Sequence, residues 1–252
     1  MAWMLVGLCL TSGCGSDAQP TSEQAVKSNE TAGAAAKTPA NPNETTSKNS
    51  DQSGAPAQAT STQTVVNPAA VKKAEELSLQ AMALQQQNKL AESTQFLTTA
   101  INANPQESKY YFSRGSAWAD LKQDANAIVD LTKAIEMSPE NAHYYSTRAL
   151  FFMTRGGGQL AVKDFTKAIE LNPNDHQAFN NRGLLFATSG NLKEARADFE
   201  QVLRIKPDSI DAMNNLGFAL MNLNEPDKAF EVLNQVIKLN PKYLNAYDNR
   251  GL

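Results

Sequence analysis

Prolines recur at a fixed interval through the last two thirds of the chain. They occupy Pro105, Pro139, Pro173, Pro207 and Pro241, and each lies 34 residues after the one before. A constant period of this length indicates a repeat array, in which one supersecondary unit is copied and stacked on its neighbours. With the proline at place 32, complete copies run over residues 74–107, 108–141, 142–175, 176–209 and 210–243, and a partial sixth covers 244–252.

Columns of the array predict two helices in each copy. Places 4, 8 and 11 lie three or four residues apart, so they share one face of a first helix, and places 20, 24, 27 and 28 do the same on a second. Place 8 is always alanine or glycine, and we expect it to face the small residue at place 20 while large residues at 4, 11 and 24 surround that contact. The proline ends the second helix, and Gly156–Gly158 and Ser189–Asn191 mark turns between helices.

This pattern resembles the tetratricopeptide repeat (TPR) family over about residues 74–252. The strongest matches are residues 111–141, 179–207 and 213–241, and the first copy departs most from the pattern. The resemblance implies an all-α fold, a right-handed solenoid of antiparallel helix pairs that binds proteins. A plain helical bundle is the alternative, and it would not keep a 34-residue phase.

The first 14 residues suggest export. Residues 1–10 are apolar and uncharged, and Cys14 follows small residues, as in a bacterial lipoprotein signal in which the cysteine is lipidated. Thr11 stands where such signals usually have leucine, and no lysine or arginine precedes the apolar run. An ordinary secretory signal or a chance apolar start are the alternatives. Cleavage before Cys14 would remove Cys9, the only other cysteine, and leave no disulfide or cysteine metal site.

Residues 15–67 read as a linker. They are built from Ser, Thr, Ala, Gln, Asn and Pro, and such a composition predicts disorder. Ordered structure is expected to begin at Asn67 and Pro68, a helix cap and a first helical residue, so the repeat domain spans residues 68–252. We expect the protein in the cell envelope, lipid-anchored, with the outer membrane weakly favoured because neither of the two residues after Cys14, Gly15 and Ser16, is Asp. A periplasmic or secreted protein is the other possibility.

Charge and residue pattern exclude several classes of function. The formal net charge is −3, and no basic stripe supports nucleic-acid binding. His143 and His176 are the only histidines and lack metal-ligand neighbours, and Gly156–Gly158 lacks the lysine of a phosphate loop. We expect no enzymatic activity, no metal and no cofactor.

The remaining candidate is the side of the first helices that lines the inner groove of TPR proteins, at places 2, 5, 6, 9, 12 and 13. Asparagines gather there. The candidate peptide-binding residues are Asn180, Asn181, Asn214, Asn215 and Asn249. They resemble the asparagine ladder of O-linked N-acetylglucosamine transferases, which holds an extended peptide. The alternative is that they bond to one another between neighbouring helices. The lysines of a carboxylate clamp for acidic chaperone tails are absent.

Charges at places 7 and 23 vary together. Arginine at place 7 and aspartate at place 23 occur in the same three copies, and both are missing from the first and fifth. This predicts three structural ion pairs within repeats: Arg114–Asp130, Arg148–Asp164 and Arg182–Asp198.

Together these features predict a membrane-tethered scaffold or adaptor that binds a protein or extended peptide outside the cytoplasm. The alternatives are a fragment of a longer enzyme or larger TPR protein, because the sixth copy stops inside its first helix, and a self-assembling structural protein. Sequence beyond codon 252 would separate the scaffold from the fragment of a longer protein.

Overall fold

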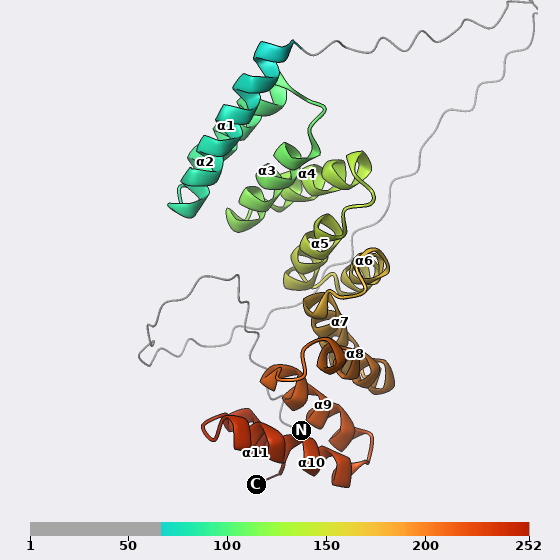
Figure 1. Cartoon of the computed structure of the whole chain (residues 1–252). Helices are drawn as coiled ribbons and strands as arrows, with labels where there is room; N and C mark the ends of the chain where they lie inside the picture. The colour runs from blue at the N-terminus through green and yellow to red at the C-terminus, as the bar shows by residue number, and fades with distance from the viewer. Residues whose placement is uncertain (1–66, 252) are drawn as a thin grey trace, which may run out of the picture. The chain divides into compact units, whose positions relative to one another are not determined.

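The computed structural model describes residues 67–251, so the predicted signal segment, Cys14 and nearly all of the predicted linker lie outside the described residues. The described part contains α-helices and no strand (Figure 1). The helices are α1 (Pro68–Gln86), α2 (Leu90–Ala103), α3 (Ser108–Asp120), α4 (Asp124–Met137), α5 (Ala142–Thr154), α6 (Gly158–Leu171), α7 (His176–Thr188), α8 (Leu192–Ile205), α9 (Ile210–Asn222), α10 (Pro226–Leu239) and α11 (Leu244–Asn249).

The helices pack in consecutive pairs, α1 with α2, α3 with α4, and so on to α9 with α10. Each second helix also contacts the first helix of the next pair. The expected all-α solenoid of antiparallel helix pairs is therefore confirmed. From α3 onward, each first helix begins at the first residue of a 34-residue copy. The first helix starts earlier, at Pro68, where the Asn67 Oδ1 accepts a hydrogen bond from the Ala69 amide at 3.0 Å, as predicted.

The proline column ends every second helix two residues before the proline itself. The intervening residue at place 31 is not helical, with φ −142° and ψ 88° at Asn104 and φ −135° and ψ 88° at Asn172. Steric contact with the proline ring disfavours the helical conformation for the residue before it. The sequence interpretation of this column is therefore confirmed.

The turn inside each hairpin requires a left-handed residue at place 15. Gly156 and Gly190 have φ of 77° and 83° there, and Asn88 and Asn224 have φ of 58° and 60°. Lys122 occupies the same place with φ 60°. Glycine and asparagine adopt this conformation readily, whereas in lysine the Cβ makes it sterically unfavourable. The glycines identified these turns in the sequence, but nothing at Lys122 did.

The core lies between the two helices of each hairpin and at the hairpin junctions. Places 20, 24 and 27 supply it, as Ala127, Leu131 and Ala134 do in the second copy, where they are at most 1% exposed. The large residues at places 4 and 11 are mostly half-buried. Two tyrosines at place 3, Tyr110 and Tyr144, are buried instead, and the sequence analysis did not anticipate them.

The small residue at place 8 allows the two helices to approach closely, but it faces place 24 of the second helix and not, as the sequence predicted, place 20. A Cβ added to Gly217 would lie 2.5 Å from Leu233 Cδ2, and one added to Gly183 would lie 2.8 Å from Phe199 Cε1. These neighbours occupy place 24 rather than the small place 20. Glycine is needed there because a bulky side chain of the second helix fills the space that a Cβ would take.

Candidate functional site

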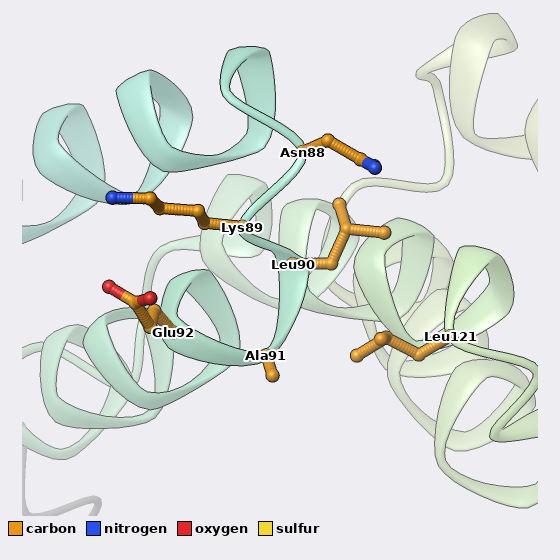
Figure 2. Close-up of a pocket in the computed structure, with 6 residues that line it drawn as sticks. All are labelled: Asn88, Lys89, Leu90, Ala91, Glu92 and Leu121. Carbon is orange, nitrogen blue, oxygen red and sulfur yellow. The ribbon is translucent and has the colours of Figure 1, made fainter.

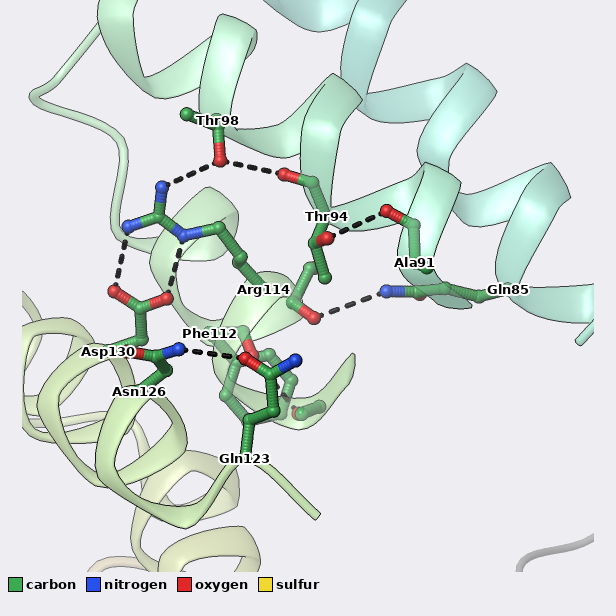
Figure 3. Close-up of polar contacts among 11 residues, drawn as sticks. Gln85, Ala91, Thr94, Thr98, Phe112, Arg114, Gln123, Asn126 and Asp130 are labelled. Atoms are coloured by element: carbon green, nitrogen blue, oxygen red, sulfur yellow. Dashed lines mark hydrogen bonds and ion pairs between the residues drawn. The ribbon is translucent and has the colours of Figure 1, made fainter. Parts of the chain in front are cut away.

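The arginines at place 7 hold three helices together. Arg114 on α3 donates to Asp130 on α4 through Nε at 2.7 Å and Nη2 at 2.9 Å. Its remaining nitrogen, Nη1, donates to Thr98 Oγ1 on α2 at 3.0 Å. Figure 3 shows the planar guanidinium between the carboxylate and the hydroxyl. The predicted Arg114–Asp130 pair therefore forms, and it also reaches the preceding repeat.

The same arrangement recurs in the next two copies. Arg148 and Arg182 bind the carboxylates of Asp164 and Asp198 through two bonds each, at 2.7 to 2.9 Å. Their Nη1 atoms reach the threonines at place 25 of the preceding copy, Thr132 at 3.1 Å and Thr166 at 3.0 Å. The three aspartate side chains are only 6% exposed. Because these guanidinium groups are already engaged, the arginine column does not form a free anion-binding stripe.

The first helices lie side by side on the inner side of the stack. α1 contacts α3, α3 contacts α5, α7 contacts α9, and α9 contacts α11, whereas α5 and α7 make no contact of this extent. Within residues 67–251, no comparable contact joins two consecutive second helices. The first helices therefore approach one another more closely, which places them on the inside of the curvature. Places 2, 5, 6, 9, 12 and 13 share the side of these helices turned away from places 4, 8 and 11, and we call this surface the first-helix face.

The asparagines on the first-helix face form two bridges between neighbouring helices. Asn215 Nδ2 donates to Asn180 Oδ1 at 3.3 Å, joining α9 to α7. Asn249 Nδ2 donates to Asn214 Oδ1 at 2.9 Å, joining α11 to α9. The inter-helix bonding left open by the sequence is thus present. Asn181, by contrast, has no hydrogen-bond partner for its side chain among the described residues.

Exposure divides these five residues into two groups. Asn214 is 6% exposed, so its amide lies behind the surface and serves mainly to hold Asn249. Asn180, Asn181, Asn215 and Asn249 are half-buried. The two donors, Asn215 and Asn249, use Nδ2 in these bridges, and within residues 67–251 their Oδ1 atoms accept no hydrogen bond.

Apolar side chains run beside the asparagines. Place 9 carries Leu150, Leu184 and Phe218 in consecutive first helices, and all three are half-buried. Leu150 and Leu184 pack on the cores of their hairpins with one side and remain partly accessible on the other. The first-helix face therefore combines a row of amides with a parallel row of apolar residues.

Two open pockets lie away from the first-helix face. Figure 2 shows the first, of about 290 Å³, which is lined by Asn88 in the turn between α1 and α2, by Leu90 at the start of α2 and by Leu121. The second, of about 540 Å³, lies among α4, α5 and α6 and includes Arg148 and Asp164, which bind each other. Neither brings together a nucleophile and a base.

Ionisation is perturbed at only a few described groups. Burial, followed by the carboxylates of Glu107 and Glu75, raises the pKa of Tyr110, which keeps this phenol neutral. The hydrogen bond to Lys228 lowers the pKa of Glu225, and Arg196 lowers it further. The bond to Glu200 raises the pKa of Arg196. These groups lie in structural contacts between helices rather than on the first-helix face.

Comparison with known families identifies the chain. Two tetratricopeptide repeat models match it, one at residues 78–142 and 147–210 and the other at residues 186–249. The chain belongs to the tetratricopeptide repeat family. The fold of this TPR array supports a role in protein–protein interaction. No curated protein matched the chain.

Solved structures share the TPR fold. YrrB, a TPR protein with an unusual peptide-binding site, is 25% identical, with a TM-score of 0.63 over 73% of this chain and 98% of that one. MamA is 19% identical, with a TM-score of 0.62 over 68% and 93%. A TPR protein from Parabacteroides merdae is 21% identical, with a TM-score of 0.64 over 71% of each chain.

The described TPR residues contain no group of three or more His, Asp, Glu or Cys side chains that could hold a metal ion. None of the helices within residues 67–251 is long and apolar enough to cross a membrane.

Proposed function

We propose that this TPR protein is a non-catalytic scaffold or adaptor that binds a protein or extended peptide partner on its first-helix face. The observation that carries the proposal is the asparagine pair that joins α7 to α9, repeated between α9 and α11. These bonds orient amides along the first-helix face. The similarity to YrrB, whose described peptide-binding site lies on the same fold, supports the proposal.

The five asparagines contribute in different ways. Asn181, Asn215 and Asn249 present free hydrogen-bonding atoms to a partner, whereas Asn180 and Asn214 hold the neighbouring amides in place. An amide can both donate to and accept from the backbone of an extended chain.

The test replaces Asn181 and Asn215 together by alanine and measures partner capture and melting temperature. We expect capture to weaken, at about 1 kcal/mol for each hydrogen bond lost, with the melting temperature almost unchanged. Asn102→Ala, on the exposed surface of α2, is the matched control. A large fall in melting temperature with normal capture would assign the asparagines to inter-helix stability alone.

We further propose that Cys14 carries the lipid that tethers this domain to a membrane outside the cytoplasm. The support is the small-residue context of Cys14 and the polar composition of residues 15–66. Stable anchoring takes two lipid chains or more, which lipoprotein processing supplies.

Radiolabelled palmitate tests the tether. We expect label in the wild type and none in Cys14→Ser, which should also leave the membrane fraction. Equal labelling of both proteins, or labelling of neither, would rule out the lipid anchor without affecting the proposed role of the first-helix face.

A further inference from the structure

The first-helix face carries almost no charge on α5, α7 and α9. At places 5, 6, 9, 12 and 13 of α5, α7 and α9, every side chain is neutral. The first of these positions is Ser146 in α5 and the last is Asn222 in α9. At place 2 of these helices the ionisable side chains are His143 and Asp211, and Asp211 already accepts a hydrogen bond from the Tyr243 hydroxyl at 2.8 Å. Helix surfaces that face water usually carry many charges. The neutrality of three consecutive helices therefore indicates a surface shaped for a neutral partner.

The nearest cations cannot compensate for a charged partner. Arg148 and Arg182 lie on α5 and α7 at place 7. Each guanidinium donates from two nitrogens to an aspartate and from the third to a threonine. An acidic side chain brought onto the face would lose water without gaining a counter-charge. A basic one would find only the carboxylates of Asp211 and Asp175, which already accept hydrogen bonds within the protein. The face thus disfavours charges of either sign.

The two rows on the face favour a definite chemistry. The amides of Asn181 and Asn215 can bond to the peptide groups of an extended chain, which are neutral donors and acceptors. The parallel row of Leu150, Leu184 and Phe218 offers apolar surface that gains from burial against aliphatic or aromatic side chains.

We propose that the face formed by α5, α7 and α9 selects extended segments that lack charged side chains and carry aliphatic or aromatic ones. This inference rests on the proposed function of the first-helix face and adds to it the class of partner. Two other occupants have suitable chemistry, namely residues 52–66 of this chain, which are uncharged, and a second copy of the array. The experiment below distinguishes them.

The test selects peptides from a random display library on the purified full chain. The peptides are about nine residues long and span roughly 30 Å when extended. We expect the selected sequences to be depleted of Asp, Glu, Lys and Arg and enriched in aliphatic and aromatic residues. Leu184→Lys, which places a charge in the apolar row, should weaken their binding about tenfold or more.

Two further variants test the discrimination by charge. Asn215→Asp keeps the size of the side chain and adds a negative charge, so its selected peptides should shift toward Lys and Arg. Gln235→Glu makes the same change on the exposed surface of α10, away from the face, and should leave the selection unchanged. Circular dichroism checks that each variant is folded.

The outcomes separate this inference from the proposed function. Selected peptides that are rich in one charge, yet lose binding in Leu184→Lys, would overturn the selectivity and leave the binding face intact. No selection at all would overturn both. Phe218 replaced by the photo-crosslinker p-benzoylphenylalanine reports the occupant directly. A crosslink to the selected peptide supports the proposal, whereas a crosslink to residues 52–66 or to a second copy would overturn it in favour of that occupant.

Discussion

Arg148 Nη1 donates a hydrogen bond to Thr132 Oγ1 at 3.1 Å, and this bond crosses the boundary between two repeats. The same guanidinium holds Asp164 through its other two nitrogens. A single side chain therefore ties the two helices of its own hairpin to the second helix of the hairpin before it. Arg114 and Arg182 make the same contacts in their own copies.

Replacing only Arg148 by leucine should destabilise the array more than replacing both partners. Asp164 would be left buried and unpaired, at a cost of about 3 kcal/mol. The double variant Arg148→Leu with Asp164→Val copies the fifth repeat, which has Leu216 and Val232 at these places, and should recover most of that loss. Urea unfolding followed by circular dichroism measures the difference. A double variant less stable than Arg148→Leu would contradict this account of the pair.

Lys122→Gly should stabilise the second hairpin. Lys122 has φ 60°, a conformation that costs a residue with a Cβ roughly 1 to 2 kcal/mol, part of which the greater freedom of glycine in the unfolded chain cancels. We expect a net gain of about 0.5 to 1 kcal/mol. Gly190→Ala, at the same place of the fourth copy, is the matched control and should lose stability. If Lys122→Gly and Gly190→Ala changed the stability in the same direction, backbone strain would not be the cause.

Ser93→Ala should also stabilise the protein. The Ser93 hydroxyl is fully buried and has no hydrogen-bond partner within residues 67–251, whereas the other copies have alanine at this place. Removing an unsatisfied buried hydroxyl should gain on the order of 1 kcal/mol. The reverse change at the equivalent place, Ala127→Ser, should lose a similar amount. Thermal unfolding of both variants tests the prediction, and a destabilised Ser93→Ala would refute it.

Asp175→Ala should weaken the start of α7. Its Oδ1 accepts from the amides of Gln177 and Ala178, and its Oδ2 accepts from the Ser146 hydroxyl on α5. Loss of such a helix cap costs about 1 kcal/mol. Hydrogen exchange should show faster exchange of the two amides in the variant. Pro173→Ala, in the same loop but without a cap contact, should leave their exchange much less affected.

Glu225→Gln should reveal a pH-dependent contact between the fourth and fifth repeats. Lys228 and Arg196 lower the pKa of Glu225 in the folded protein, so its contribution to stability is present above the unfolded pKa of about 4.3. That contribution is lost as the pH falls through the lower folded pKa. The wild type should therefore be more stable than the variant at neutral pH, and the difference should vanish in acid. A difference that is the same at pH 7 and pH 3 would exclude the linkage.

Much of this architecture follows from the sequence because it depends on local rules. The proline period set the repeat boundaries, and the 3.6-residue period of a helix determined which columns face the core. The pairing of Arg114 with Asp130 could be inferred because the two charges appear and vanish together within a copy. The asparagines of the first-helix face were found in the same way, from their places in the helix.

The tertiary structure decided the contacts between repeats. Threonine recurs at place 25 in the three copies that precede Arg114, Arg148 and Arg182, but whether its hydroxyl meets the guanidinium depends on how one hairpin is rotated against the next. The burial of Tyr110 and Tyr144, and the bonds from Asn215 to Asn180 and from Asn249 to Asn214, depend on the same rotation. Periodicity describes one helix and the turn that follows it. The angle between stacked hairpins results instead from all side chains at the junction packing together, so only the folded array shows which atoms meet there.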